Sequence, residues 1–425
     1  MSHIMKKLFL VTGVCLGVCL ESAGSGFSLY EPTARATAYA GALLGRGVDG
    51  SANSINPATL TDITNITVTA GFVTEHPRAR IKINGEPSRP MDPGFFVLPH
   101  VHVVSPLLWG FTFGFGITPD YGLGTHYTHD NPMNWSSREV TIKGFVFNPN
   151  LAYRITDDWS VGAGARLLFF DFEQYSYPQA AFANPYTGQT MSGGTVKNHL
   201  KGDNGTCDAG WQIGTSYRIL ENLSAGIVYK SKIDVHVKGR TTARRREVAV
   251  PTAVGSYRAA LNGPAGTTIE LPQSVAFGLN WDITRTWHLG TMASWTQWSS
   301  IDTLAFRLNG NLKPIEMHWK DTWRFAVAPS WDFARDWTAI LSYVYDSNCC
   351  PSDQCSTMLP PGDRQIVTGG LCWQMTENLA CDMSYGLVVM GCKTMHMRDA
   401  LGQEYRLAAH RGLSHAVGFS VTYRF

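Results

Sequence analysis

The chain has 425 residues, of which 16% are charged and 12% are aromatic, and its formal net charge is +2 at pH 7. Soluble domains average about 25% charged residues, so the shortage of charge fits a protein with part of its surface in lipid. A nearly neutral chain gives no reason to expect nucleic acid as a partner. Beyond the N-terminus, no apolar stretch reaches the ~18 residues that a transmembrane helix needs, so the sequence predicts none.

Residues 1–25 have the pattern of a cleavable secretory signal peptide. A basic start precedes an apolar run from Leu8 to Leu20, which is too short to span a bilayer as a helix. Small residues follow, as a cleavage site requires, so the mature chain is predicted to begin near Gly26. A lipoprotein signal ending at Cys15 or Cys19 is the alternative, and the valine before each cysteine argues against it.

Residues 26–62 are rich in Ala, Gly, Ser, Thr and Asn and show no strand periodicity. A short helix near 32–43 fits this composition. On composition alone, the segment could be a compact unit or a flexible periplasmic tail.

From residue 63 onward, apolar residues alternate with small or polar ones at period two, which is typical of strands with two different faces. In the last segment, Val417 and Phe419 fall on one face, and Gly418 and Ser420 fall on the other. Bacterial barrels have an even number of strands, and the sequence predicts fourteen, near residues 63–74, 95–105, 109–118, 140–154, 159–171, 206–218, 223–237, 272–283, 287–307, 317–332, 337–347, 364–375, 379–391 and 413–425.

A soluble β-sandwich also alternates, but three features favour an all-β fold that is a transmembrane antiparallel barrel. The segments run about 10–14 residues, whereas strands of globular proteins usually have about 5–6. Trp and Tyr gather at the ends of the apolar faces, as in an aromatic girdle. Short connections alternate with long ones, as periplasmic turns and external loops do. The long loops are predicted near residues 119–139, 172–204, 238–269, 348–362 and 392–412.

A fourteen-stranded barrel has a lumen too wide for its own side chains to fill, since about eight strands mark that limit. We therefore expect residues 26–62 to form a plug inside the barrel of residues 63–425. The last residue, Phe425, completes the apolar face of the final strand, and we expect this C-terminal signature to engage the barrel assembly machinery. The predicted location is the outer membrane of a diderm bacterium, with membrane lipid around the barrel.

Several motifs along the mature chain resemble the FadL/TodX family of outer-membrane transporters for long-chain fatty acids and other hydrophobic molecules. The segment Asp49 to Ala58 is similar to the family's hatch motif, whose core here is Asn56-Pro57-Ala58. Other similar segments are Gly26–Leu29, Tyr121–Thr125 with Trp135, Trp295–Ser299, Trp319–Arg324 and Leu359–Arg364. Each motif alone is weak, but together and in this order they are specific. The Cys- and Arg-rich external loops depart from the family pattern.

The resemblance implies a route for the ligand. External loops capture a hydrophobic molecule in an apolar groove, and the molecule moves into a pocket in the lumen. The hatch around Asn56, Pro57 and Ala58 then shifts, and the molecule leaves sideways near the third strand. A lined pocket and a lateral exit shorten the time that an apolar chain spends in water. The expected function is passive uptake of long-chain fatty acids or similar molecules by a monomer that is not an enzyme and needs no cofactor.

Candidate residues can be assigned to three parts of this route. Glycine and proline allow a strand to bend or to lose ladder hydrogen bonds, as a lateral exit near the third strand would require. The candidates there, which could also be ordinary barrel residues, are Gly116, Pro119, Gly122 and Gly124. The capture groove would use loop residues that could instead pack the loops on themselves, namely Tyr175, Tyr177, Phe182, Val254 and Leu261. A carboxylate in the lumen would need a cation, and the arginines of lumen-facing parity, which could instead form a charge network, are Arg166, Arg218 and Arg324.

The cysteines and histidines of the external loops give weaker signals. Cys349, Cys350 and Cys355 are expected to form one disulfide within their loop because export is oxidising, and the sequence leaves the pair open. His126 and His129 have a possible ligand spacing but lack Cys or acidic partners at set intervals, so no metal site is predicted.

Two other function classes remain open, an outer-membrane enzyme barrel and a surface-exposed adhesin. The neighbours Ser414 and His415 would point to opposite faces of a strand, which argues against a catalytic dyad. An adhesin is supported only by the Cys- and Arg-rich loops, whose run Arg244–Arg246 is otherwise expected to meet anionic lipid headgroups. A plug at residues 26–62 would separate transport from both classes.

Overall fold

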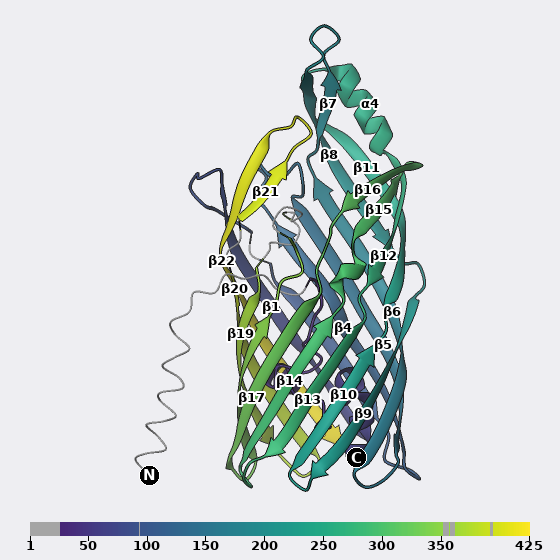
Figure 1. Cartoon of the computed structure of the whole chain (residues 1–425), viewed down its shortest axis with the longest axis vertical. Coiled ribbons are helices and arrows are strands. Elements are labelled where there is room, and N and C mark those ends of the chain that lie inside the picture. The colour runs from purple at the N-terminus through teal and green to yellow at the C-terminus, as the bar shows by residue number, and fades with distance from the viewer. Residues whose placement is uncertain (1–25, 93, 352–356, 358–361, 392–393) are drawn as a thin grey trace.

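The period-two alternation folds into a closed ring of antiparallel strands (Figure 1). The computed structural model describes residues 26–92, 94–351, 357, 362–391 and 394–425, and the predicted signal peptide of residues 1–25 lies outside them. Fourteen strands form the ring, as the sequence predicts, and the last pairs with the first. In ring order they are β1 (Thr67–Ile83), β3 (Phe96–Val104), β4 (Phe111–His126), β5 (Glu139–Arg154), β6 (Trp159–Ser176), β9 (Asp208–Leu220), β10 (Leu223–Lys230), β13 (Ser274–Asp282), β14 (Trp287–Thr296), β17 (Thr322–Ala334), β18 (Trp337–Asp346), β19 (Arg364–Gln374), β20 (Leu379–Met390) and β22 (Glu404–Arg424).

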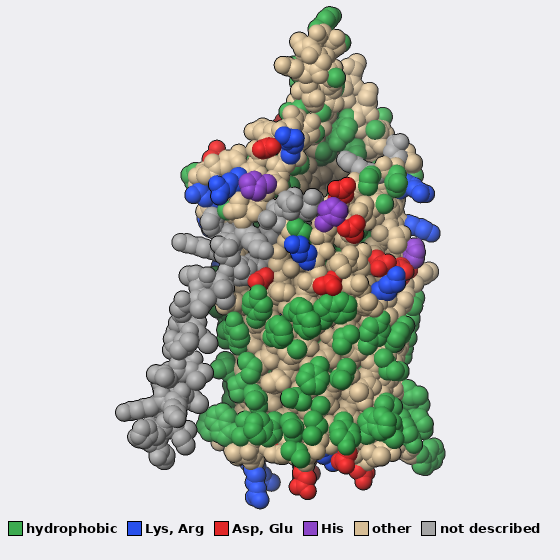
Figure 2. All heavy atoms as spheres, viewed as in Figure 1, with side chains coloured by type: hydrophobic (Ala, Val, Ile, Leu, Met, Phe, Trp, Pro, Cys, Tyr) green, Lys and Arg blue, Asp and Glu red, His purple; other side chains and the backbone are tan. Residues whose placement is uncertain are grey.

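The outer face of the ring carries the apolar side chains of the strands. On β22, Val417 is 49% exposed, whereas Ser420, on the opposite face of the strand, is fully buried. At the short-turn end, the rings of Trp287 and Trp331 stack with their centroids 5.5 Å apart. Figure 2 shows a dense apolar row there, a broader apolar band above it, and charged side chains beyond both limits. Aromatic rows around an apolar belt are what a lipid-facing barrel requires.

The last residue, Phe425, lies beside the first strand. Its backbone amide donates to the carbonyl oxygen of Ile66 at 2.9 Å, and its ring meets Tyr423 edge-on at 4.7 Å between centroids. The chain terminus therefore lies at the seam that closes the ring. The role of Phe425 in assembly stays a prediction.

On one side, the wall continues beyond the membrane as an upper sheet (Figure 1). This sheet consists of β7 (Gln179–Ala183), β8 (Thr190–Asp203), β11 (Ile233–Val248), β12 (Gly263–Leu271), β15 (Thr303–Leu308) and β16 (Asn311–Glu316), with the helix α4 (Pro251–Leu261) on it. Two smaller strands, β2 (Arg89–Pro90) and β21 (Thr394–Arg398), pair with β1 and β22, and a 3₁₀ turn, η2 (Trp298–Ser300), separates β14 from β15.

The prediction of long loops at residues 172–204 and 238–269 was wrong, because most of these residues belong to the upper sheet. A strand outside lipid needs no apolar outer face, so its outward positions can all be polar. On β11, the buried Val237 alternates with the exposed Lys238 and Arg240. The predicted strands 223–237 and 287–307 are also each interrupted, the first after Lys230 and the second at η2.

The N-terminal segment lies inside the ring. It contains α2 (Ala34–Ala38), α3 (Ala52–Ile55) and the 3₁₀ helix η1 (Pro57–Asp62). The Thr33 hydroxyl caps α2 by accepting a hydrogen bond from the Ala36 amide, and α2 ends before Ala40 and Gly41, whose φ values are positive. The helix is thus shorter than the one expected near 32–43. Within the described residues, no helix is long and apolar enough to cross a bilayer.

Candidate functional site

The hydrogen-bond ladder between β3 and β4 stops partway along the wall. β3 pairs with β1 from Phe96 to Val104, but its pairing with β4 starts only at Val101, opposite Ile117. Further along, the Asp92 amide donates to the His126 carbonyl at 2.8 Å and closes the opening again. We call the stretch between these two pairings the wall window.

The start of the N-terminal segment pairs with β4 at the wall window. The Leu29 amide donates to the Asp120 carbonyl, and the Gly122 amide donates to the Phe27 carbonyl, both at 2.9 Å. Residues 27–29 therefore satisfy part of the edge that β3 leaves unpaired. The register of β4 on β5 also shifts between Pro119 and Tyr121.

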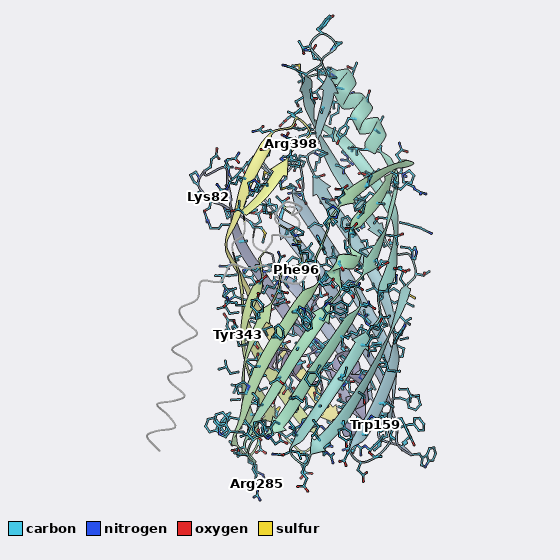
Figure 3. All side chains as sticks on the ribbon, in the orientation of Figure 1. Lys82, Phe96, Trp159, Arg285, Tyr343 and Arg398 are labelled. Carbon is cyan, nitrogen blue, oxygen red and sulfur yellow. The ribbon has the colours of Figure 1, made fainter. Side chains whose placement is uncertain are left out.

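The four strand residues singled out in the sequence all lie on β4 around this window. A Cβ atom on Gly122 would lie 2.8 Å from the Leu29 side chain, and one on Gly124 would lie 1.9 Å from the Phe96 ring. Phe96 lies near the middle height of the molecule (Figure 3). Gly122 and Gly124 therefore allow two side chains to pack directly on the backbone of β4. Gly116 lies below the window, where a Cβ would lie 2.7 Å from His102 Nδ1.

A cavity of about 570 Å³ adjoins the wall window. Charged residues line its inner part, namely Glu31, Glu75, Arg324 and Arg364. Apolar residues such as Met91, Leu98, Leu123 and Ile142 line its middle. The lining also includes Phe95, which is 67% exposed, and Val97 on the outer face. One cavity is therefore bordered both by buried charges and by the outer apolar face.

Two arginines hold the N-terminal segment at the inner part of this cavity. The Arg324 guanidinium lies 4.1 Å from the centroid of the Tyr30 ring and 3.3 Å from Asp346. The Arg364 guanidinium donates to the Gly26 carbonyl at 3.1 Å. Burial raises the pKa of the Glu31 carboxyl group above its ordinary value, and the charges of Arg324 and Arg364 offset this only in part.

The three arginines proposed from parity do not come together. Arg324 lines the large cavity, while Arg166 is bound to Asp120 at 3.1 Å and lines a separate space of about 120 Å³. Arg218 is half exposed near the short-turn end, paired with Asp158 at 3.3 Å. Arg364 was missed as a site residue, although it ends one of the motifs that carry the family resemblance. Nothing in the sequence indicated a role for Glu31 except its position close to the expected mature N-terminus.

The Asn56-Pro57-Ala58 triplet ties the N-terminal segment to the wall. The Asn56 side-chain amide donates to the Leu44 carbonyl at 2.7 Å and to the Thr215 carbonyl of β9 at 3.0 Å. Its side-chain oxygen accepts from the Ala58 amide at 3.1 Å, and Pro57 begins η1. One side chain therefore shapes a turn and joins two different parts of the lumen.

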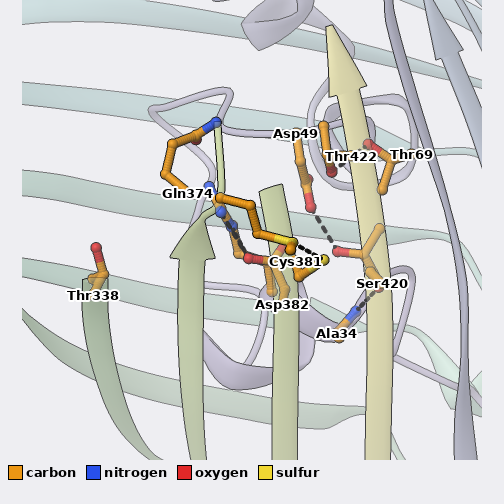
Figure 4. A network of polar contacts seen from close by, with 12 residues as sticks. Ala34, Asp49, Thr69, Thr338, Gln374, Cys381, Asp382, Ser420 and Thr422 are labelled. Carbon is orange, nitrogen blue, oxygen red and sulfur yellow. Dashed lines mark hydrogen bonds and ion pairs between the residues drawn. The ribbon is translucent and has the colours of Figure 1, made fainter. Parts of the chain in front are cut away.

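Buried polar contacts hold α2 on the opposite wall (Figure 4). The Arg35 guanidinium contacts Asp382 of β20 at 2.7 Å. The Ala34 amide donates to Ser420 of β22 at 2.8 Å. Further along the segment, Arg46 donates to Asp282 of β13 at 2.8 Å. The segment therefore contacts strands on opposite sides of the ring.

The residues proposed for a capture groove are spread over the upper sheet. Val254 and Leu261 lie on α4 and are buried against the upper sheet, while Tyr177 is buried and hydrogen-bonded to His129 at 2.8 Å. The Tyr175 ring stacks on His199 with 4.2 Å between centroids, and Phe182 lies on β7. They do not form one groove, and their role in capture stays a prediction.

The remaining sequence signals concern metals and disulfides. Among the residues that the structure describes, no group of three or more His, Cys, Asp or Glu side chains could hold a metal ion. The Sγ atoms of Cys349 and Cys350 lie 3.7 Å apart. Cys355 lies outside the described residues, so the disulfide stays a prediction.

Comparisons with known proteins agree with this architecture. A family model described as outer membrane protein transport protein (OMPP1/FadL/TodX) matches residues 17–425. The long-chain fatty acid transport protein of Salmonella typhi is 25% identical over 403 residues, which is 89% of this chain and 91% of the relative. Outer membrane protein P1 of Haemophilus influenzae is 22% identical over 80% of this chain and 77% of its own length.

Solved structures share the fold. A FadL homologue of Pseudomonas aeruginosa superposes with a TM-score of 0.83 at 18% identity, covering 94% of this chain and 100% of that chain. The toluene transporter TodX of Pseudomonas putida gives a TM-score of 0.69 at 15% identity over 95% of this chain and 99% of its own.

Proposed function

Because the chain belongs to the OMPP1/FadL/TodX family of outer membrane transport proteins, we propose that it takes up long-chain fatty acids or similar hydrophobic molecules across the outer membrane. One curated relative is named a long-chain fatty acid transport protein, and one solved relative is named a toluene transporter. The ligand class common to both names is a hydrophobic molecule. An enzyme barrel and an adhesin are the alternatives, and several of the matching proteins are named transporters.

The observation that carries this proposal is the large cavity beside the wall window. Its volume of about 570 Å³ falls in the usual range of about 300–1,000 Å³ for small-molecule sites. Its apolar middle suits a hydrocarbon chain, which gains about 0.8 kcal/mol per buried CH₂ group. Its outer border includes the outward-facing Phe95, Val97 and Phe145 beside the exposed Lys143, so a ligand could pass from the cavity into the membrane without crossing a polar lumen.

The charged inner part of the cavity suits the head of a fatty acid. A carboxylate there would compete with Glu31 for Arg324 and Arg364. Glu31 follows residues 27–29 closely, and these residues pair with β4 at the wall window. Binding of the head group would therefore loosen the same short segment that fills the window. This is a physical route from ligand binding to lateral release.

The N-terminal segment acts as the hatch in this proposal, and external loops capture the ligand first. Asn56, Pro57 and Ala58 fix one end of the segment to β9, and the Gly26 end reaches Arg364. The segment can therefore change at its first residues while its helices stay in place. Movement of residues 26–31 is the smallest change that would clear the window.

A crosslink between the segment and β4 tests the route. Ser28 and Tyr121 form an isolated antiparallel bridge, and paired positions of this kind suit a disulfide. The double variant Ser28→Cys, Tyr121→Cys should bind oleate as the wild type does but should not take it up until a reductant is added. The two single variants are the controls. Uptake of oleate by the oxidised double variant at the wild-type rate would refute release through the window.

A further inference from the structure

The upper sheet carries a band of positive charge on its outer side. β8 and β11 pair antiparallel, which places Arg240 directly opposite Lys201 and Arg244 directly opposite Lys197. Lys238 lies two residues before Arg240, and on β15 Arg307 pairs with Gly266, which itself pairs with Lys238. We call these six residues the outer basic face, namely Lys197, Lys201, Lys238, Arg240, Arg244 and Arg307.

The strands fix the direction of these side chains. On β11, the inward neighbours Val237, Thr241 and Ala243 are buried, so Lys238, Arg240 and Arg244 point outward. On β8, the buried Val196 alternates in the same way with the exposed Lys197. The charges therefore belong to a paired sheet and are not carried by a loose loop.

Like charges directly opposite on neighbouring strands destabilise a sheet, and the outer basic face contains two such pairs. Within the described chain, none of the six side chains forms an ion pair or a hydrogen bond. Two carboxylates share this face, because Glu173 of β6 lies directly opposite Lys201 and Asp203 lies directly opposite Lys238. Each also accepts a hydrogen bond from another donor, His199 for Glu173 at 2.7 Å and the Gly205 amide for Asp203 at 2.8 Å. In the described ladder, the opposed pair Lys197–Arg244 has no carboxylate directly opposite either residue. An anion bound from outside would relieve the repulsion.

The height of the face argues against phospholipid headgroups as this anion. The ring of Tyr229 contacts Trp211 at 5.0 Å in the upper aromatic girdle, and Lys238 follows nine residues later in the chain. A strand advances about 3.3 Å per residue and is tilted by about 40°, so the six steps from Lys232 to Lys238 alone carry the chain about 15 Å along the barrel axis. The headgroup layer is about 5–8 Å thick on each side. The face therefore stands above that layer.

The residues between the charges favour a polysaccharide over a single-stranded nucleic acid. Single strands bind by stacking their bases on aromatic side chains. The outward residues of β8 and β11 in the described structure include no Phe, Tyr or Trp from Lys197 to Asp203 or from Asp234 to Arg244. Tyr175 of the neighbouring strand β6 lies opposite His199, but its ring already stacks on that imidazole and contacts Arg138. Thr242 lies between Arg240 and Arg244 on β11, and its hydroxyl is exposed. Hydroxyl and cationic groups in rows match sugar hydroxyls with sulfate or carboxylate substituents.

We propose that the outer basic face binds an anionic extracellular polysaccharide, with sulfate or carboxylate groups placed between the opposed cations of β8 and β11. This binding would be independent of the lumen cavity, because all six residues lie on the outside of the upper sheet. It would anchor the barrel to an acidic glycan layer without affecting passage of the ligand.

The test uses the full chain in zwitterionic detergent with a heparin fragment as the sulfated probe. Saturable binding that weakens with salt is expected, and neutral dextran should not bind. The variant Lys201→Glu, Arg240→Glu should weaken heparin binding at least about tenfold, since it reverses one opposed pair of charges. The control variant Arg285→Glu, Arg335→Glu changes two exposed arginines in the short turns at the opposite end of the barrel. Arg285 is labelled in Figure 3. This variant should bind heparin as the wild type does.

Heat-modifiable migration and oleate binding should be unchanged in both variants. These two measurements separate a loss of heparin binding at the surface from a loss of folding. Equal binding by the wild type and the Lys201→Glu, Arg240→Glu variant would overturn the proposal, as would an equal loss in the control. Stronger competition by a single-stranded oligonucleotide or by lipopolysaccharide than by free heparin fragment would also overturn it. Failure of oleate uptake would bear on the proposed transport alone.

Discussion

Two seams of the wall lie close to β1, and they differ in how they are held. The β1–β22 seam is paired from Thr67–Arg424 to Ile83–Leu407 with one shift near Arg78. The β3–β4 seam is paired only from Val101–Ile117 to Val104–Gly114. The seam joining the two ends of the chain is thus the continuous one, and the seam between consecutive strands is open. The hydrogen-bond ladder of this barrel is interrupted where the N-terminal segment pairs with the wall, and not where the ring closes.

The glycines of the two seams show the same difference. A Cβ on Gly71 of β1 would lie 2.1 Å from the backbone oxygen of Phe419, whereas a Cβ on Gly124 of β4 would meet the Phe96 side chain. Backbone cannot move aside without breaking the ladder, but a side chain can rotate. The first seam is therefore rigid by construction, and the second can change locally.

The largest effect is expected from Gly71→Val. The added side chain would collide with the backbone of β22, so the ring should fail to close. Folded protein, measured by heat-modifiable migration in gels, should fall below detection. Gly122→Ala is the matched control, because its new atom would meet only the end of the Leu29 side chain. Normal yield of Gly71→Val would show that the closing seam tolerates separation.

Deletion of Phe425 should reduce assembly without preventing it. The deletion removes the hydrogen bond that the Phe425 amide donates to the Ile66 carbonyl and an exposed ring at the closing seam, and a single hydrogen bond contributes about 1 kcal/mol. The yield of folded barrel in the outer membrane should fall several-fold, as measured by surface labelling. Phe425→Tyr keeps both contacts and serves as the control. Unchanged yield after deletion would contradict the signature role.

The double change Asn56→Ala, Pro57→Ala should impair uptake while leaving the barrel assembled. Loss of the Asn56 side chain leaves the Leu44 and Thr215 carbonyls without this partner, at a cost of about 1–3 kcal/mol for each buried group left unpaired. Oleate uptake should fall about tenfold, which corresponds to about 1.4 kcal/mol. Thr64→Ala, just beyond η1 at an exposed position, is the control. Wild-type uptake would exclude a hatch role for the triplet.

Phe96→Ala tests the open seam directly. The ring that covers Gly124 would be removed, so the window should widen and a hydrophobic dye should leak from the lumen faster by a few-fold. Phe95→Ala removes a neighbouring ring that does not pack on Gly124. Equal leak in both variants would mean that Phe96 does not cover the window.

Arg364→Gln tests the charged inner part of the cavity. The guanidinium that holds the Gly26 carbonyl would be lost, and a charged hydrogen bond is worth about 1.5–3 kcal/mol. Oleate should bind roughly tenfold more weakly, while its methyl ester, which has no charge, should bind as before. Tryptophan fluorescence of the purified protein can follow both ligands. An equal loss for both would assign Arg364 to the structure of the cavity instead of the head group.

The ring could be predicted from the sequence because lipid imposes one rule on every strand. Outward residues such as Val417 must be apolar and inward ones such as Ser420 need not be. The alternation of the strands, their lengths and their number could therefore all be predicted from the sequence. The upper sheet escaped prediction because that rule ends where the lipid ends. Lys238 and Arg240 alternate with buried residues, but a polar outer row resembles a loop in the sequence.

The candidate site was only partly predictable. Gly122 and Gly124 marked the window because a missing side chain is visible in the sequence. Parity placed Arg166, Arg218 and Arg324 on the inner side of the wall, but depth along the strand decides which space each one reaches. The pairing of residues 27–29 with β4 joins segments that are almost 100 residues apart, and no local pattern encodes it.

The buried contacts of α2 set an order on biogenesis. The Ala34 amide needs Ser420, and Arg35 needs Asp382, both of which lie at the far end of the chain. Contacts of such long sequence separation form late in folding. The first residues of the described chain are therefore among the last to reach their final positions. A barrel whose last strand has not closed lacks the partners of α2, so the N-terminal segment can complete its contacts only after the ring has closed.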